Sequence, residues 1–425
     1  MPYRAIARAF LAGELTVEQI SERATRVLGS SSRSITRAAR QFVKTFPPDK
    51  TRPRLRDVEE FLRRFRGLRK FSVEQWLTES QQMQPANAAA GWPIPPIPTV
   101  GALAAFLALN PGDLEWFADL HGLNRKANTR LRHYHYRVVA KQSGTFRLIE
   151  APKPRLKQLQ RKILAEILEK VPPHPAVHGF LKGRSIRTFV APHVGQRVVL
   201  KMDLEDFFPS ISRARVQALF RTMGYPEPVA DLLGGICTTI APSDIWKARD
   251  LYTQSHLPQG APTSPALANL CAWRVDCRLS ALAKSAGAVY TRYADDLAFS
   301  GDESFERSAE RFSTLVAAIL QEHGFSVHHR KTRIMRRSVQ QHLAGLIANE
   351  KINVRRADFD RLKAILTNCI RQNPASQNRE AHPHFRLHLQ GKVAFVESIN
   401  PARGKRLRAL FDQISWDGSW DNQGD

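Results

Sequence analysis

The chain has 425 residues, of which 43% are hydrophobic and 24% charged, values typical of a globular protein rather than a disordered one. Lys and Arg number 64 against 39 Asp and Glu, and the net charge of +25 predicts a polyanionic partner, most commonly nucleic acid. No apolar run is long enough to span a membrane, arginines interrupt the apolar N-terminus and the four cysteines form no CxxC pair, so we expect a cytoplasmic protein with no membrane anchor, secretory signal or disulfide framework.

Residues 1–83 are predicted to form a basic domain of short helices. The first 100 residues contain 17 Lys and Arg against 9 Asp and Glu. Between residues 52 and 70, the apolar residues from Phe61 to Leu68 recur at helical spacing among arginines, which predicts a helix with an apolar side and an arginine side. The arginine side is either an ordinary solvated surface or a contact for RNA or DNA.

Five prolines in residues 84–98 predict an extended, semi-rigid linker before a second unit. A helix is expected from Gly101 to Leu109. The helix after it has Asn110 as its N-cap and Pro111 at its first position.

Strand-like residues follow at 134–149, where residues 142–145 are the expected turn of a hairpin, and a basic helix is predicted over 156–170. The apolar run from Val198 to Met202 then predicts a buried strand with Asp203 at its end. A buried carboxylate is costly unless it is paired or binds a cation.

The segment AVYTRYADDLAFSG, residues 288–301, predicts a hairpin with two adjacent acids, Asp295 and Asp296, at its tight turn. Aspartate is common in turns, so an isolated pair would indicate no more than a turn. Here the flanking runs are apolar enough to be core, and we expect the acids to face a cleft. Together with Asp203 they form a carboxylate set suited to two divalent cations, which favours nucleotidyl transfer.

Three segments resemble the motifs of reverse transcriptases, in the order of that family and at compatible spacing. DLEDFFPSI, residues 203–211, resembles the first catalytic motif, and LPQGAPTSPALANL, residues 257–270, resembles the loop and helix before the catalytic box. YADD, residues 293–296, resembles the box itself. The resemblance covers about residues 100–420 and does not include the N-terminal helices.

Within that family, the chain looks most like the bacterial retron reverse transcriptases, through AVHGFLKGRSIRTFVAPHVG at residues 176–195. It departs from the retron pattern at two places. Phe189-Val190 stand ahead of His193 where retrons have an Asn-Ala pair, and Leu343-Ala344-Gly345 stand where retrons have Val-Thr-Gly.

The resemblance implies an α+β fold of the right-hand polymerase type. Fingers and palm would occupy residues 99–345 and a helical, basic thumb residues 346–425, with the N-terminal helical domain as an addition. The implied activity is RNA-directed DNA synthesis from dNTPs with two Mg²⁺ ions, for which Mn²⁺ is a substitute. By resemblance to retrons, part of a structured noncoding RNA is copied into single-stranded DNA (msDNA) from an RNA 2′-hydroxyl, and the RNA–DNA hybrid stays bound. The family's setting is antiphage defence, with a separate effector protein.

The resemblance also implies roles for single residues in catalysis. Asp203, Asp295 and Asp296, with the backbone carbonyl of Leu204, correspond to the metal ligands. Lys331 would protonate pyrophosphate or, equally, contact a phosphate.

Further residues correspond to positions that bind the nucleotide. Phe208 falls at the steric gate against a 2′-hydroxyl, or else is a core aromatic. Gln259 and Gly260 match the loop that lines the nucleotide pocket. Arg147 and Lys153 fall where the fingers would contact the triphosphate, with plain surface charges as the alternative.

Two other functions stay open from the sequence. Another bacterial reverse transcriptase class, whether non-retron defence-associated, group II intron-like or diversity-generating, shares the three core motifs. A non-catalytic RNA-binding scaffold would keep the fold and the basic surface, although the intact acids, Gln259 and Lys331 argue against it.

Overall fold

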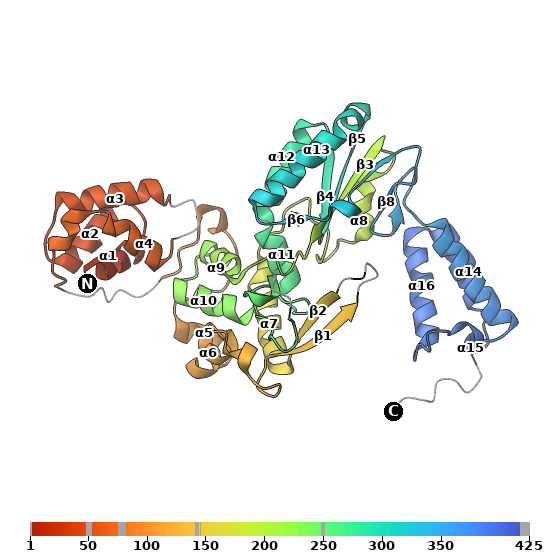
Figure 1. Cartoon of the computed structure of the whole chain (residues 1–425), viewed down its shortest axis with the longest axis horizontal. Coiled ribbons are helices and arrows are strands. Elements are labelled where there is room, and N and C mark those ends of the chain that lie inside the picture. The colour runs from red at the N-terminus through yellow and green to blue at the C-terminus, as the bar shows by residue number, and fades with distance from the viewer. Residues whose placement is uncertain are drawn as a thin grey trace. The chain divides into compact units, whose positions relative to one another are not determined.

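A computed structural model describes residues 2–47, 53–74, 82–140, 144, 146–247 and 251–416. Contacts divide the chain into two compact units, the first made of residues 1–174 and 206–273 and the second of residues 175–205 and 274–425. Figure 1 labels their helices and strands. The sequence analysis divides the chain differently, into residues 1–83, 84–98, 99–345 and 346–425, and that division stays a prediction.

The first unit begins with a bundle of short helices, α1 (Pro2–Leu11), α2 (Val17–Leu28), α3 (Arg33–Thr45) and α4 (Leu55–Arg63), followed by the 3₁₀ turn η1 (Arg66–Lys70). Their apolar faces share one interior. Phe42 lies in it, with its ring centroid 5.2 Å from that of Phe10 and 5.8 Å from that of Phe61. The single helix predicted between residues 52 and 70 is wrong in extent, because the α-helix ends at Arg63 and the last turn, which contains Gly67, is 3₁₀.

The remaining elements of the first unit are η2 (Asn87–Ala89), α5 (Val100–Leu107), α6 (Pro111–Ala118), η3 (Leu123–Lys126), β1 (Tyr134–Ala140), β2 (Phe146–Pro152), α7 (Pro154–Glu166), η4 (Leu168–Lys170), α9 (Arg213–Thr222), α10 (Glu227–Ile236), η6 (Leu251–Thr253) and α11 (Ser264–Cys271). The predicted cap is confirmed, since the Asn110 side chain accepts a hydrogen bond from Asp113 N at 2.8 Å. The helix predicted to reach residue 170 ends as α7 at Glu166 and continues as η4.

The predicted hairpin between residues 134 and 149 is also confirmed. β1 and β2 pair in antiparallel register, with Ala140 opposite Phe146. Of the four turn residues predicted between these strands, three lie outside the described residues, and Gly144 adopts a positive φ of 80°.

The proline-rich segment 84–98 packs against α9 and the residues that follow it. Gln84 N and Ala86 N donate to the carbonyls of Gly224 and Thr222 at 2.9 and 3.0 Å. Gly224 has a φ of +100°, and a Cβ there would come within 2.4 Å of Pro85 N, so the close approach requires glycine. This segment is therefore part of the packed structure of the first unit.

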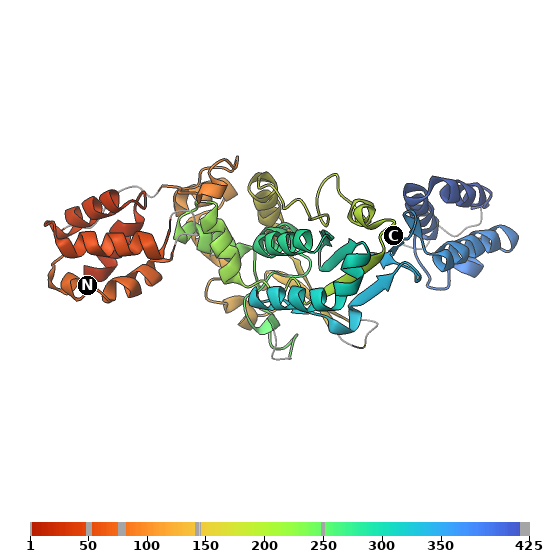
Figure 2. The same ribbon diagram turned by 90° about the horizontal axis from the view of Figure 1, so that it is seen from above.

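The second unit contains α8 (Ile186–Val190), η5 (Ala191–His193), β3 (Val198–Glu205), α12 (Trp273–Ser285, from its second residue), β4 (Val289–Tyr293), β5 (Asp296–Gly301), α13 (Glu303–Glu322), β6 (Ser326–Val327), η7 (His329–Lys331), β7 (Arg333–Arg336), β8 (His342–Leu343), β9 (Leu346–Ile347), β10 (Asn353–Val354), α14 (Arg356–Arg371), α15 (Pro374–Gln377), α16 (Phe385–Ile399) and α17 (Pro401–Phe411). Figure 2 shows the helices from α14 onward grouped together. One apolar core joins these helices to β8–β10, α8 and the sheet.

β3 is the central strand of an antiparallel sheet. It pairs with β5 on one edge and with β7 and β6 on the other, and β4 lies beyond β5. The predicted strand end at Met202 is wrong, because pairing with β6 prolongs β3 to Glu205 and places Asp203 inside the strand. None of the described helices combines the length and apolar character needed to cross a membrane.

Candidate active site

The hairpin of β4 and β5 carries two of the predicted aspartates. Tyr293 pairs with Asp296, so Ala294 and Asp295 form a two-residue turn, which confirms the predicted tight turn. Ala294 has a left-handed φ of 55°, a strained conformation for a residue with a side chain. Arg292 Nη1 donates to the Ala294 carbonyl at 3.1 Å and so holds the turn in this shape.

The sheet register places the third aspartate beside this turn. Asp203 on β3 is directly opposite Asp296 on β5. Side chains of directly opposite residues project from the same face of a sheet, with Cβ atoms about 5 Å apart. Leu204 N donates to the Asp295 carbonyl at 2.9 Å. The second unit therefore brings Asp203, Leu204, Asp295 and Asp296 together from two chain segments.

Lysines accompany two of the three carboxylates. Lys331 Nζ donates to Asp203 Oδ1 at 2.8 Å, and Lys201 Nζ forms an ion pair with Asp296 Oδ1 at 2.8 Å. Burial raises the pKa of Asp295, and the charges of Asp296 and Asp203 raise it further, whereas Lys331 lowers it. Three carboxylates therefore lie close together at this point of the sheet, and the ammonium groups of Lys331 and Lys201 pair with two of them.

These residues fit a divalent cation by their chemistry. Across the described ranges, no three His, Cys, Asp or Glu side chains already stand in an arrangement that could hold a metal ion. Nevertheless, three carboxylates and a carbonyl are the hard oxygen ligands that Mg²⁺ prefers. The pKa of Asp295 is raised first by burial and then by the charges of Asp296 and Asp203, and a bound cation would oppose both effects. In this structure the two lysine ammonium groups occupy Oδ1 of Asp203 and Oδ1 of Asp296.

A buried ionic network lies behind the turn. Arg292 Nε and Nη2 donate to the two carboxylate oxygens of Asp276 at 2.8 and 2.7 Å, and the Tyr290 hydroxyl donates to the same carboxylate at 2.8 Å. The Arg292 and Asp276 side chains are 1% and 0% exposed. Gly179 adds a close contact on another side, because a Cβ there would lie 2.6 Å from Ala294 N. The turn is therefore held by a charge network and by tight backbone packing.

His193 is a neutral bridge within the same sheet. Its ring nitrogens lie 2.6 Å from Ser300 Oγ on β5 and 2.7 Å from Thr291 Oγ1 on β4. The ring is fully buried, and this burial lowers the pKa of His193 to about 3. At neutral pH it therefore links the two strands without a charge.

The predicted nucleotide-binding residues belong to the first unit, whereas the three aspartates and Lys331 belong to the second. Phe208 is half-buried beside the buried Phe207, with ring centroids 5.6 Å apart, so Phe207 is the core aromatic of the pair. Arg147 is exposed on β2. Lys153 Nζ donates to the carbonyls of Thr129 and Arg130 at 2.9 and 2.8 Å, which ties down a neighbouring loop.

The loop of Gln259 and Gly260 lies against Glu150 of β2. Glu150 N donates to the Gln259 carbonyl at 2.8 Å, while the Gln259 amide donates to the Tyr252 hydroxyl at 3.2 Å. Gly260 has a φ of +134°, and a Cβ there would lie 3.0 Å from the Glu150 carbonyl oxygen. Glycine is therefore required at this point of the loop.

Sequence reasoning missed several residues that position these groups. In the first unit, Glu150 Oε2 lies 2.9 Å from His256 Nε2, and both side chains are almost fully buried. No sequence signal reveals this pair, because its members are 106 residues apart. Lys201 did leave a signal, since it lies two residues before Asp203 in an apolar strand and therefore on the same face.

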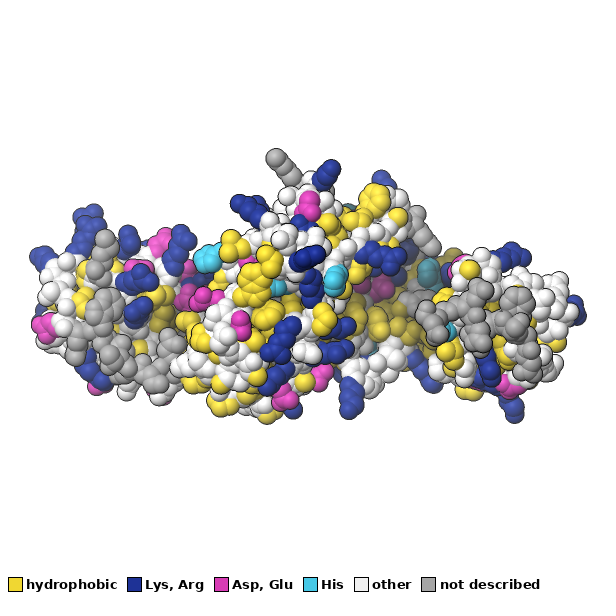
Figure 3. Space-filling view, turned by 90° about the horizontal axis from the view of Figure 1, so that it is seen from below, with side chains coloured by type: hydrophobic (Ala, Val, Ile, Leu, Met, Phe, Trp, Pro, Cys, Tyr) yellow, Lys and Arg dark blue, Asp and Glu magenta, His cyan; other side chains and the backbone are white. Residues whose placement is uncertain are grey.

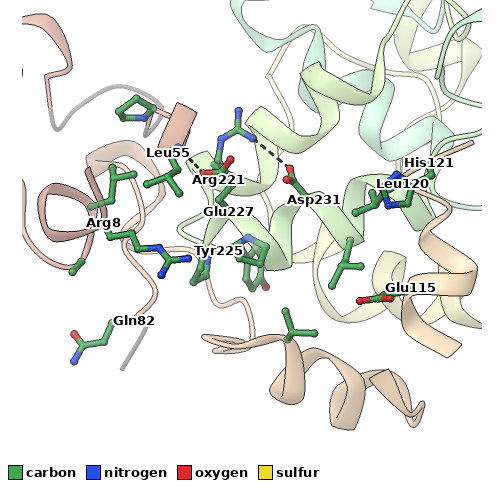
Figure 4. A pocket seen from close by; sticks show the side chains of 17 residues that line it. Arg8, Leu55, Gln82, Glu115, Leu120, His121, Arg221, Tyr225, Glu227 and Asp231 are labelled. Atoms are coloured by element: carbon green, nitrogen blue, oxygen red, sulfur yellow. Dashed lines mark hydrogen bonds and ion pairs between the residues drawn. The ribbon is translucent and has the colours of Figure 1, made fainter. Parts of the chain in front are cut away.

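A cavity of about 750 Å³ forms a separate feature of the first unit, lined by residues of α1 and α4 and by residues around α10. Figure 4 shows Glu227 and Asp231 on its wall near Arg221. Leu55 N donates to Glu227 Oε2 at 2.7 Å, which links α4 to α10. Burial raises the pKa of Glu227 and Asp231. None of the predicted site residues is among those that line it.

The sequence matches known proteins over most of its length. The family described as "Reverse transcriptase (RNA-dependent DNA polymerase)" matches residues 139–354, about half of the chain. The retron Mx65 reverse transcriptase of Myxococcus xanthus is 43% identical over 312 residues, which cover 72% of this chain and 69% of the relative. The retron Mx162 enzyme of the same organism is 36% identical over 332 residues, 74% of this chain and 66% of that protein.

A third relative, the retron Ec86 reverse transcriptase of Escherichia coli, is 31% identical over 269 residues, which cover 63% of this chain and 76% of that protein. The departures at Phe189-Val190 and Leu343-Ala344-Gly345 therefore occur inside a clear family relationship. The chain belongs to the retron reverse transcriptases, RNA-directed DNA polymerases of the right-hand fold that use an RNA template and a divalent metal.

Proposed function

We propose that this reverse transcriptase copies part of a cognate structured noncoding RNA into single-stranded msDNA, priming from an RNA 2′-hydroxyl. Its setting would be antiphage defence, with a separate effector protein. The observation that carries the catalytic part is the register that sets Asp203 opposite Asp296, next to the turn residue Asp295. The retron part rests on the 43% identity to the Mx65 enzyme.

In this proposal, Asp203, Asp295, Asp296 and the Leu204 carbonyl hold two Mg²⁺ ions. When bound, such ions lower the pKa of the attacking 3′-hydroxyl and neutralise the triphosphate of the dNTP. Lys331 stands 2.8 Å from Asp203, and it leaves this carboxylate to give a proton to pyrophosphate or to contact a phosphate. Lys201 likewise moves away from Asp296 when the cations bind. In the absence of the cations, the two lysines neutralise part of the negative charge of the aspartates.

The residues of the first unit would select and bind the dNTP. Gln259 and Gly260 line the nucleotide pocket, and the half-buried ring of Phe208 rejects a 2′-hydroxyl. Arg147 is exposed and therefore accessible to the triphosphate, whereas Lys153 must first release the carbonyls of Thr129 and Arg130.

The decisive experiment is to purify the protein from its native-locus host and sequence the bound nucleic acid with and without RNase. A short DNA joined to one RNA species is the expected result. In parallel, extension of an oligo(dT) primer on poly(rA) with Mg²⁺ and dTTP should fall by about 10³-fold or more in the variant Asp295→Asn/Asp296→Asn, because the metals supply several kcal/mol of transition-state stabilisation.

A matched control is Asp302→Asn, which changes a carboxylate just past the opposite end of β5 from Asp296. The Asp302 side chain caps α13 by accepting from Ser304 N at 2.9 Å, and asparagine is an equally good N-cap. This variant should extend the primer normally. RNA without attached DNA and extension unaffected by the double substitution would indicate a scaffold. Normal extension without RNA-linked DNA would indicate another mode of priming.

A further inference from the structure

The outward face of α3 consists of cationic side chains. Arg33, Arg37, Arg40 and Lys44 are all exposed, and their spacing of four, three and four residues places them on one side of the helix. The opposite side is formed by Ile35, Ala38, Ala39 and Phe42, all of which are buried in the interior of the N-terminal bundle. The packing of the bundle therefore fixes which way the four cations face.

Within the part of the chain that the structure describes, no acidic side chain neutralises these four charges. The helix from Arg33 to Thr45 contains no acidic residue, and no ion pair of the four is found among the described residues. Arg33 also lies in the first turn, where the helix macrodipole disfavours a cation. On the neighbouring α2, by contrast, Arg26 is paired with Glu22 at 3.0 Å, and the buried Arg23 donates to the carbonyls of Ala9 and Glu14.

A second basic segment packs against the start of α3. A Cβ at Gly67 would lie 2.6 Å from Ser34 Oγ, which shows how closely η1 approaches the helix. The exposed side chains of η1 include Arg66, Arg69 and Lys70. Figure 3 views the bundle from the side opposite to α3 in Figure 1, and on that side Lys and Arg are mixed with Asp and Glu. The exposed cations of α3 and η1 therefore belong to two elements that pack against each other.

We infer that this α3 stripe, defined as Arg33, Arg37, Arg40 and Lys44, binds the phosphate backbone of a double-stranded stem in the RNA that the enzyme copies. The four residues span about 16 Å along the helix, with about 6 Å between positions four residues apart, which suits a row of phosphates. Exposed guanidinium groups form strong, charge-assisted bonds to phosphate. Such contacts position a duplex without reading its sequence, and a double-stranded RNA stem is recognised largely through its shape and backbone.

The inference deepens the proposed function by naming the RNA contact of the N-terminal helices, and it rests on that function for the RNA itself. The test uses the full chain and a fluorescent RNA hairpin with a stem of about 20 base pairs as the probe. Anisotropy titrations from 50 to 300 mM KCl give the dissociation constant and its salt dependence. The variant is Arg33→Gln/Arg37→Gln/Arg40→Gln/Lys44→Gln.

We expect binding at 100 mM KCl to weaken by at least about 10-fold, and the slope of log K against log[KCl] to fall by about 3, since each phosphate contact contributes close to one unit. A charge-matched control replaces Arg278, Lys284, Arg307 and Arg311, exposed residues of α12 and α13, with Gln. The control lowers the net charge equally and should keep most of the affinity. The variant Arg33→Lys/Arg37→Lys/Arg40→Lys should keep the slope.

Equal losses in the two quadruple variants would overturn the inference, because the effect would then come from net charge. Unchanged RNA binding together with loss of a co-purifying acidic protein would overturn it in favour of a protein interface. Primer extension on poly(rA)/oligo(dT) separates this test from that of the proposed function. If the wild-type enzyme does not extend the primer, the proposed function fails, whereas normal extension with unaltered hairpin binding by the α3 variant contradicts the α3 inference alone.

Discussion

The N-terminal bundle and the region around the YADD turn handle charge in opposite ways. In the bundle, apolar side chains such as Phe42 fill the interior and most arginines face outward. Around the turn, Arg292, Asp276 and His193 are buried, and Asp203 is 7% exposed. Apart from the buried Arg23, the bundle follows the general rule that charged groups stay in solvent, whereas the region around the turn buries several of them.

The difference concerns which interactions set the position of the backbone in each region. Burial of charge is costly and is tolerated when each group has a partner. Near the turn those partners are specific, as Arg292 shows by bonding both Asp276 and the carbonyl of the strained Ala294. The ionic network therefore maintains a backbone shape that hydrophobic packing alone would not specify. In the bundle, apolar packing sets the positions of the helices, and the arginines of the α3 stripe are exposed at its surface.

The largest effect is expected from breaking the buried ion pair. Asp276→Ala should lower the free energy of unfolding by about 3–5 kcal/mol, because it leaves the Arg292 guanidinium buried without a counter-ion. Urea unfolding followed by tryptophan fluorescence measures this loss. Primer extension should fall with it, since the Arg292 contact to Ala294 depends on the same network.

The matched change in the bundle is Glu22→Ala, which removes the partner of the exposed Arg26. An exposed pair of this kind contributes about 0.5 kcal/mol or less, so stability and extension should stay close to wild type. A similar loss in both variants would contradict the contrast between the two regions.

Two glycines provide a second comparison. Gly179→Ala brings a Cβ to 2.6 Å from the backbone nitrogen of Ala294, and the turn has to shift to relieve the clash. We expect a loss of about 1–3 kcal/mol in stability and about 10-fold or more in the rate of extension, because displacement of the turn moves Asp295. Thermal unfolding and single-nucleotide incorporation measure the two effects.

Gly67→Ala in the bundle is the control. Its Cβ would also come within 2.6 Å of another atom, but that atom is Ser34 Oγ, which can rotate away. Extension by this variant should be unchanged and its stability nearly so. If Gly179→Ala were as harmless as Gly67→Ala, the turn would not be under the tight packing described here.

The smallest effect concerns pH and the buried His193. Its pKa is lowered to about 3 by burial, whereas the unfolded chain has the ordinary value near 6.5. Between these values the unfolded chain binds the extra proton, so stability falls as pH falls. One such histidine contributes about 1 kcal/mol of loss between pH 7 and pH 5.5.

Urea unfolding at the two pH values measures this loss, and His193→Gln should reduce the slope. His178, whose pKa burial lowers to about 4, continues to contribute in that variant. An unchanged slope in His193→Gln would show that this histidine is not held neutral.

Local patterns predicted much of the fold. The short N-terminal helices, the Asn110 cap, the hairpin of β1 and β2 and the tight turn at Asp295 all follow from spacing and turn chemistry, which act between residues close in the chain. The errors lie at element ends. β3 continues past Met202 because it pairs with β6, which comes more than 100 residues later. A pattern read along one segment contains no information about such a partner.

The class of the protein and the identity of its acids could be predicted from the chain alone, because Asp203, Asp295 and Asp296 lie in motifs that keep their order and spacing. The partners of these acids, in contrast, could be identified only from the folded chain. The pairing of Lys201 with Asp296 follows from strand register, and Arg292 meets Asp276 through a helix packed behind the sheet. The Glu150–His256 pair joins residues that only folding brings within 2.9 Å. Motifs specify which groups are present, whereas register and packing, set by long-range burial and hydrogen bonding, specify which groups meet.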